Sequence, residues 1–295
     1  MKQALPGNGT GRAALYALVS VALWPVAEAF GGLILRNHTI YQTVWLRYTT
    51  HILLLVLVCL PRGGLRLFAT RRPVLQICRG LLMFGMPVAF IASAEQASWR
   101  DAWAMLWVFP FMVLLAAPVL LGERSGRWRW MAAAVGFIGA MVVVQPDAGI
   151  RAAFLPGLLV AATFAGYVLI TRMLRGESLT ASLFYTALGA LIPLTVAQPF
   201  VWTPLQPSDV VGMLGIGGLG LLVLAFLDRA LEHADAGFIA PFYFGVVVAE
   251  TFLVTLARGL PRLSVLAGCV LVCAGIAMVF MERLPRVSGT AEAAA

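Results

Sequence analysis

Charged residues are scarce in this sequence. Only 12% of the 295 residues are Asp, Glu, Lys or Arg, whereas 61% are hydrophobic, and the mean hydropathy is +0.92. A soluble domain with this composition would carry a very large exposed apolar patch. The net charge of +8 comes from short spacers between apolar runs, which is typical of membrane topology and not of nucleic-acid binding. The composition excludes a soluble globular protein and predicts a membrane protein that binds no nucleic acid.

Motifs for ATP use or catalysis are also missing. The sequence contains no GxxxxGK(S/T) loop, no HExxH and no Gly-x-Ser-x-Gly. Its four cysteines lie in or beside apolar runs without a CxxC pair, which favours buried thiols over a metal site. We therefore expect no enzyme, no metal ion and no cofactor. The first apolar run lacks a small-residue cleavage site, so we expect a retained helix and not a signal peptide.

Ten apolar runs are long enough to cross a bilayer, which takes about 20 helical residues. They cover residues 13–35, 41–60, 74–97, 102–121, 128–145, 153–174, 181–201, 209–231, 236–257 and 263–282. Several spacers are only a few residues long, so neighbouring helices must run antiparallel. The expected fold class is an all-α polytopic membrane protein in lipid, as a monomer or homodimer, with a disordered C-terminal tail at 285–295.

The distribution of Lys and Arg predicts the orientation. With ten spans both termini lie on one side of the membrane, and 14 of the 21 Lys and Arg residues fall on that side. The other side holds five, and Arg47 and Arg79 lie within spans. Since cytoplasmic loops are rich in Lys and Arg, both termini are expected in the cytoplasm, with the protein in the cell inner (plasma) membrane.

Short sequence matches indicate an internal duplication. Asp101-Ala102 is repeated at Asp235-Ala236, and Gly139-Ala140-Met141-Val142-Val143 resembles Gly275-Ile276-Ala277-Met278-Val279 at a nearly constant offset. The predicted repeats are residues 13–147 and 148–284, preceded by a cytoplasmic segment at 1–12. Because each contains five spans, an odd number, the second repeat must enter the membrane in the opposite direction. Inverted repeats of this kind are common in secondary transporters, which bind their substrate between the halves.

A family resemblance adds to this interpretation. Helices 3 to 5 read Arg79-Gly80-Leu81-Leu82, Asp101-Ala102, Pro110 and Leu121-Gly122-Glu123-Arg124, and helix 9 reads Ala240-Pro241-Phe242-Tyr243. This pattern resembles the drug/metabolite transporter superfamily in its EamA-type, ten-helix form, near the branch of S-adenosylmethionine and riboflavin transporters. The resemblance implies two inverted five-helix repeats around a central cavity lined mainly by helices 1, 3, 4, 6, 8 and 9. One departure is Leu256-Ala257-Arg258-Gly259, where the family often repeats its Gly-Glu step.

Ionisable residues within the spans are candidates for binding or proton coupling, because charge inside a bilayer is costly. Glu28, Arg47 and Glu250 fall at similar depths, which predicts that Arg47 pairs with Glu28 and with Glu250. A static bridge between two helices is the alternative. His51 lies four residues after Arg47 and is a third coupling candidate, although a helix-packing role is equally compatible.

Arg79 lies near the cytoplasmic end, where its long side chain can snorkel, and it matches the family's helix 3 arginine. It is therefore a substrate-binding candidate as well. Glu95 and Asp228 lie near helix ends and are expected at the membrane interface.

Aromatic residues and prolines complete the predicted site. Substrate-binding candidates within the spans are Trp24, Trp107, Phe164, Tyr167 and Tyr243, while Trp99 and Trp103 are expected in an interfacial belt. Packing against lipid or other helices is the alternative for each ring. Pro25, Pro87 and Pro193 interrupt helix hydrogen bonding, and Pro110 and Pro241, one in each predicted half, are gating candidates.

The favoured function is secondary transport of a small organic metabolite, such as an amino acid, an S-adenosylmethionine-like solute, a nucleoside or a flavin-like solute. Alternating access between the two sides, driven by a proton or solute gradient, is the expected mechanism. The alternatives are a small-solute channel, which is usually built by oligomers around a pore, and an intramembrane enzyme, which would need paired catalytic groups at depth.

Overall fold

The computed structural model describes residues 8–96, 98–147 and 150–283, and every regular element in these ranges is a helix. Ten helical segments are long and apolar enough to cross a membrane, which confirms the number predicted from the sequence. Their boundaries lie within a few residues of the predicted ones, apart from longer first, second and fourth spans. The predicted tail at 285–295 and the first seven residues of the N-terminal segment lie outside the described residues.

The first five spans are formed by α1 (Asn8–Ile34), α2 (Ile40–Gly63) with η1 (Gly64–Phe68), α3 (Pro73–Gln96), α4 (Trp99–Leu106) with α5 (Phe109–Leu120), and α6 (Arg127–Val144). The last five are formed by α7 (Ile150–Met173), α8 (Leu179–Val201), α9 (Asp209–His233), α10 (Ala236–Ile239) with η2 (Ala240–Phe244) and α11 (Gly245–Arg258), and α12 (Leu263–Met278) with η3 (Val279–Arg283).

Polar side chains begin several of these helices. Thr39, Ser98 and Ser178 precede α2, α4 and α8, and each side-chain oxygen accepts a hydrogen bond from the backbone N–H three residues later. Such caps satisfy N–H groups that have no partner within the helix. At the C-terminal ends of helices, glycines with positive φ follow the last turn, as Gly122 (φ 69°) does after α5 and Gly259 (φ 90°) does after α11. The short connections therefore follow from local chemistry.

Only two of the five prolines divide a span. Pro110 lies at the start of α5, directly after the break between α4 and α5, and Pro241 lies in η2, between α10 and α11. In contrast, Pro25, Pro87 and Pro193 lie inside continuous helices: each lacks the N–H for one helical hydrogen bond, but none of them divides its helix. Pro110 and Pro241 are both buried, so protein surrounds the irregular backbone at both breaks, as a bilayer requires.

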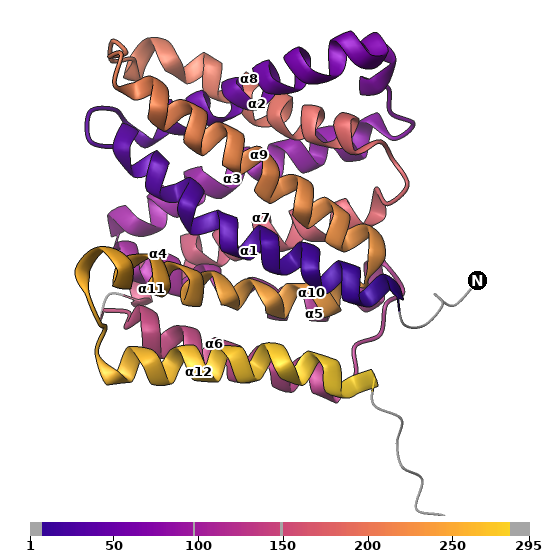
Figure 1. Ribbon diagram of the computed structural model, residues 1–295, viewed down its shortest axis with the longest axis vertical. Helices are drawn as coiled ribbons and strands as arrows, with labels where there is room; N and C mark the ends of the chain where they lie inside the picture. The colour runs from indigo at the N-terminus through magenta and orange to yellow at the C-terminus, as the bar shows by residue number, and fades with distance from the viewer. Residues whose placement is uncertain (1–7, 97, 148–149, 284–295) are drawn as a thin grey trace, which may run out of the picture.

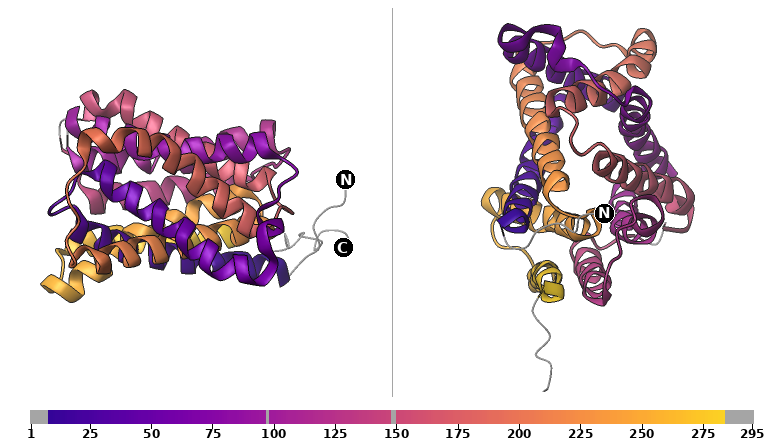
Figure 2. Two further views of the ribbon diagram at one scale, coloured as in Figure 1. Left: turned by 90° about the horizontal axis from the view of Figure 1, so that it is seen from above. Right: turned by 90° about the vertical axis from the view of Figure 1, so that its right-hand side faces the viewer.

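The helices form one bundle in which residues far apart in sequence lie side by side (Figure 1). α1 packs against α9, α3 against α7 and α8, and α6 against α12. Figures 1 and 2 place the described chain ends, Asn8 and Arg283, at the same end of the bundle. We call this the terminal end and the opposite one the far end. The fourth span runs from the far end to the terminal end, and the ninth runs the other way.

Small residues allow the closest helix crossings. At the crossing of α3 and α8, a Cβ atom added to Gly189 would lie 2.6 Å from the Cα atom of Gly80. At the crossing of α6 and α12, a Cβ atom on Gly139 would lie 2.7 Å from the carbonyl oxygen of Gly268. These distances are too short for any side chain, so glycine is required for backbone contact at both places.

Candidate functional site

A cavity of about 310 Å³ lies between the helices in the half of the bundle nearer the far end. It extends from Leu35, Ile40 and Trp99 at the far end inward to Met83 and Leu224. Trp99 is 54% exposed at the mouth, whereas Met83 and Leu224 are buried. Its volume is at the lower end of the range for small-molecule sites. Five of the spans implied by the family resemblance line it (the first, third, fourth, sixth and eighth), and α2 contributes as well.

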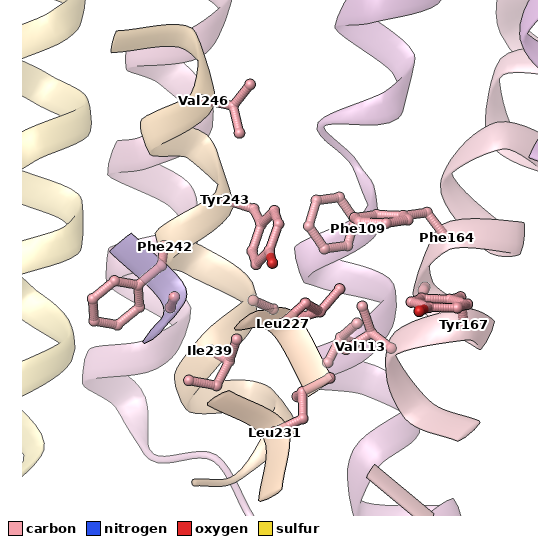
Figure 3. Close-up of a cluster of buried hydrophobic side chains, with 14 of the residues drawn as sticks. Phe109, Val113, Phe164, Tyr167, Leu227, Leu231, Ile239, Phe242, Tyr243 and Val246 are labelled. Atoms are coloured by element: carbon pink, nitrogen blue, oxygen red, sulfur yellow. The ribbon is translucent and has the colours of Figure 1, made fainter. Parts of the chain in front are cut away.

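Aromatic rings form the inner part of the cavity. Trp24 and Phe164 both line it and meet edge to face, with ring centroids 5.4 Å apart. Phe109 and Tyr243 pack behind Phe164, at 4.6 Å and 5.9 Å between centroids (Figure 3). The Tyr243 hydroxyl lies 2.8 Å from the Ser20 hydroxyl, which in turn donates to the carbonyl of Val223. This packing holds the two cavity-facing rings in fixed positions.

The only ion pair among the described residues that line the cavity joins α1 and α2. Arg47 Nη1 donates to Glu28 Oε1 at 3.0 Å, which confirms the pairing predicted from depth. The Glu28 side chain is 40% exposed, so this carboxylate is available to a molecule in the cavity. The cavity thus offers one exposed carboxylate, paired with a guanidinium, between aromatic walls.

The other two predicted coupling residues lie outside the cavity. Glu250 is exposed on α11 and makes no ion pair with Arg47 within the described ranges, so that predicted pairing is wrong. His51 is fully buried where α2 crosses α9, edge-on to Tyr48 and against the backbone at Gly220. Within the described chain, no group of three or more His, Cys, Asp or Glu residues is arranged to hold a metal ion.

Below the cavity, towards the terminal end, lies a second charge pair. Arg79 Nη2 donates to both carboxylate oxygens of Asp228, at 2.7 Å and 3.0 Å, and to the Tyr167 hydroxyl at 2.9 Å. Arg79 is fully buried and bound to Asp228, so the expectation that it snorkels is wrong, and Asp228 is itself only 8% exposed. Snorkelling is absent because the Arg79 side chain faces the neighbouring helix instead of the near membrane surface.

A larger network of charges closes the terminal end. Arg172 Nε donates to Glu123 Oε1 at 2.6 Å, and Arg172 also pairs with Asp235 at 3.4 Å. Arg129 pairs with Asp235 and with Glu282, at 3.2 Å in both cases. Glu123 Oε2 accepts the N–H of Ala236, the first residue of α10, at 2.8 Å. We call these six residues the terminal-end network; its contacts join helices before residue 148 to helices after residue 149.

Comparisons with known proteins agree with this architecture. The chain is 30% identical over 213 residues to an S-adenosylmethionine uptake transporter of Rickettsia conorii, covering 71% of this chain and 72% of the relative. The chain belongs to the drug/metabolite transporter superfamily. It is also 32% identical to a riboflavin transporter of Rhizobium johnstonii over 62% of each chain. A pseudopaline exporter of Pseudomonas aeruginosa is 27% identical, over 66% of this chain and 70% of the relative.

Two further comparisons concern the fold. A crystal structure that is 19% identical superposes with a TM-score of 0.78, covering 92% of this chain and 98% of that one. At this identity the likeness shows the fold alone. No family model matches the chain. Drug/metabolite transporter relatives and ten apolar helices together make this a multi-pass membrane protein, and its relatives' names point to a transporter and not an enzyme.

The predicted binding residues of this drug/metabolite transporter divide into two groups. Trp24, Glu28, Arg47 and Phe164 line the cavity. The others lie outside it: Arg79 and Tyr167 below its inner end, Tyr243 behind its aromatic wall, Glu250 on the surface, and Trp107 against Trp103 and Phe244.

Several lining residues were not among the predicted ones. Met83, Met86 and Phe90 give α3 a cavity face, and Trp99 and Trp103, expected in an interfacial belt, line the mouth. Residues 83, 86, 87 and 90 follow helical spacing, but every face of α3 is apolar, so this spacing alone could not identify the cavity face.

Proposed function

We propose that this protein carries a small organic solute across the membrane by alternating access. The proposal rests mainly on one observation: a cavity with a charge pair and aromatic walls that opens at the far end, while charge pairs close the terminal end. A carrier needs a site that is open to one side at a time, and this arrangement corresponds to one of its two states. The transporters among its relatives support the same function.

The two predicted halves, residues 13–147 and 148–284, provide the moving parts in this proposal. Several helix contacts are reciprocal, as an inverted repeat requires: the first span packs on the eighth, and the sixth packs on the third. Gly139 meets Gly268, and Gly275 meets Ala132 in the same way. The broken spans at Pro110 and Pro241 correspond as well and run in opposite directions, so we propose these two breaks as gating bends.

We place the terminal end in the cytoplasm and the cavity mouth on the outer face of the inner membrane. The support is the excess of Lys and Arg on the terminal side of the spans. In this orientation the structure corresponds to an outward-open carrier with a closed cytoplasmic side.

The lining chemistry favours a planar solute that carries both charges. Trp24 and Phe164 can contact a flat ring or a cation. The exposed carboxylate of Glu28 suits an ammonium or sulfonium group, and the guanidinium of Arg47, which also lines the cavity, suits a carboxylate or carbonyl. Amino acids, S-adenosylmethionine-like solutes, nucleosides and flavin-like solutes all present some of these groups, and zwitterions present both charges.

The test is solute binding followed by counterflow. Thermal-shift measurements on purified protein with amino acids, nucleosides, S-adenosylmethionine and flavins select the solute, and proteoliposomes loaded with it should then exchange labelled solute. Trp24→Leu, which removes one aromatic wall of the cavity, should weaken exchange roughly tenfold, corresponding to about 1.4 kcal/mol for the lost ring contacts. Trp128→Leu is the matched control, because Trp128 lies beside Arg127 outside the cavity.

Two results would overturn the proposal. If both variants exchange solute as fast as the parent, the cavity is not part of the transport path. Current that follows voltage without saturation or exchange would indicate a channel in place of a carrier.

A further inference from the structure

The Arg79–Asp228 pair separates two spaces in the bundle. On the far side, Met83 and Leu224 line the cavity, and each lies four residues, about one helical turn, from Arg79 and Asp228 respectively. On the terminal side, Arg79 and Asp228 themselves line a second, small pocket of about 20 Å³, which has room for roughly one water molecule. The Arg79–Asp228 pair therefore separates the cavity from the terminal-side pocket.

This pair also joins the two predicted halves, because Arg79 belongs to α3 and Asp228 to α9. Tyr167 of α7 accepts a hydrogen bond from Arg79, and the guanidinium carbon lies 4.8 Å from the centre of the Tyr167 ring. Since three helices converge on one guanidinium, the halves cannot separate here unless Arg79 leaves Asp228.

Separating two opposite charges in a buried site is costly, because one of them is left without its partner. Arginine does not release its proton in proteins, so only the carboxylate can lose its charge. Protonation of Asp228 removes the attraction that holds α3 to α9. The terminal-side pocket has room for a water molecule beside the same carboxylate, and such a water can deliver the proton.

We propose that Asp228 is the proton-binding site of the transport cycle, and that binding a proton there releases Arg79 and opens the cavity to the terminal end. The proton enters from the terminal-side pocket, adds to a carboxylate oxygen of Asp228 and leaves by the same pocket when the pair re-forms. This proposal rests on the proposed carrier function and adds the residue through which the proton concentration at the terminal end controls the opening of that end.

The sequence-based coupling candidates fit this role less well. Glu28 pairs with Arg47 inside one predicted half, so its protonation would not release one half from the other. Glu250 is exposed and outside the cavity, and His51 is buried at a distance from both spaces. Asp228 differs from all three because it touches a water-sized pocket and holds an arginine of the other half.

Other charged or titratable groups lie around Asp228 and must be controlled for. From α3 it faces Arg79, from α7 Tyr167, and from η2 Tyr243. The pocket and the adjoining helix ends contribute Arg172, Arg175, Glu177, Arg229 and Glu232. Glu95 is exposed at the far end of α3 and lines neither the cavity nor the terminal-side pocket, which makes Glu95→Gln the control for Asp228→Asn.

The experiment measures access to the cavity floor from each side of the membrane. Cys59, Cys78, Cys269 and Cys273 are first replaced, and a single cysteine is introduced by Met83→Cys. An impermeant methanethiosulfonate reagent is then added from the terminal side or the far side at about pH 5 and about pH 8. The ratio of the two labelling rates is used, because it cancels the dependence of thiol reactivity on pH.

The terminal-to-far ratio should rise roughly tenfold from about pH 8 to about pH 5 in the parent and in Glu95→Gln. Asp228→Asn should give the high ratio at both pH values, while Asp228→Glu should keep the change. If Asp228→Asn does not reach the membrane, Arg79→Gln/Asp228→Asn removes both charges of the pair and should also give a ratio independent of pH. A pH-independent ratio in the parent, or an unchanged pH dependence in Asp228→Asn or in the double variant, would overturn the proposal.

No solute is needed for this labelling, so the two proposals fail separately. A pH-dependent ratio that requires Asp228, without exchange of any solute, would support the proton site and refute the carrier function. Exchange by the parent together with a pH-independent ratio would support the carrier function and refute the proton site.

Discussion

Arg172 makes several of the contacts that close the terminal end. Its guanidinium is almost fully buried and donates to Glu123, to the carbonyl of Leu231 at 2.6 Å and to Asp235. Arg172→Met leaves Glu123, which is 12% exposed, without its cation. Breaking a buried pair costs about 3–5 kcal/mol, and Glu123 keeps its hydrogen bond from Ala236, so we expect a loss of about 3 kcal/mol.

The Asp235 contact adds little to this value. Its carboxylate is 39% exposed, and contacts of this kind contribute at most about 1 kcal/mol. The matched control is Arg175→Met, three residues later on the same side of the membrane. Arg175 is exposed and forms no ion pair within the described ranges, so the same substitution should change stability by less than about 0.5 kcal/mol.

The assay is unfolding in mixed micelles by increasing dodecyl sulfate, followed by the loss of helical circular dichroism. Glu123→Gln/Arg172→Met should recover part of the loss, because glutamine carries no charge but can still accept the hydrogen bond of Ala236. Equal stability of Arg172→Met and Arg175→Met would refute the structural reasoning. So would a double variant less stable than Arg172→Met.

Two further predictions concern packing and capping. Gly189→Val would force a side chain into the backbone of Gly80 and should cost about 1–3 kcal/mol, whereas Gly218→Ala meets only Leu54 at 3.7 Å and should be nearly neutral in the same unfolding assay. Ser98→Ala removes the cap that accepts from the N–H of Asp101 and should cost about 1 kcal/mol; an unchanged midpoint would show that α4 does not depend on its cap.

The outer charge pair could be predicted from the sequence. Depth along a helix follows from counting residues at about 1.5 Å each, so Glu28 and Arg47 could be placed in one layer. Counting does not reveal the direction in which a side chain points. Glu250 was placed in the same layer by the same count, yet it is exposed on α11, outside the cavity, and does not pair with Arg47.

The inner charge pair could not be predicted in this way. Arg79 and Asp228 each lie within two turns of a helix end, where a side chain can reach the interface, and 149 residues separate them. In a soluble protein the apolar face of a helix indicates its buried side. In lipid the outer faces are apolar too, so periodicity does not distinguish them from the packed ones.

The amino-acid sequence was enough to define the ten spans and their approximate ends, because each helix satisfies its backbone hydrogen bonds within its own residues. Counting residues along these helices also placed Glu28 and Arg47 at one depth and so predicted their pairing. The faces that line the cavity, and the contact of Arg79 with Asp228 beneath it, became visible only in the packed bundle. These depend on how the helices pack against one another, and contacts between distant segments are not encoded in the composition of either helix.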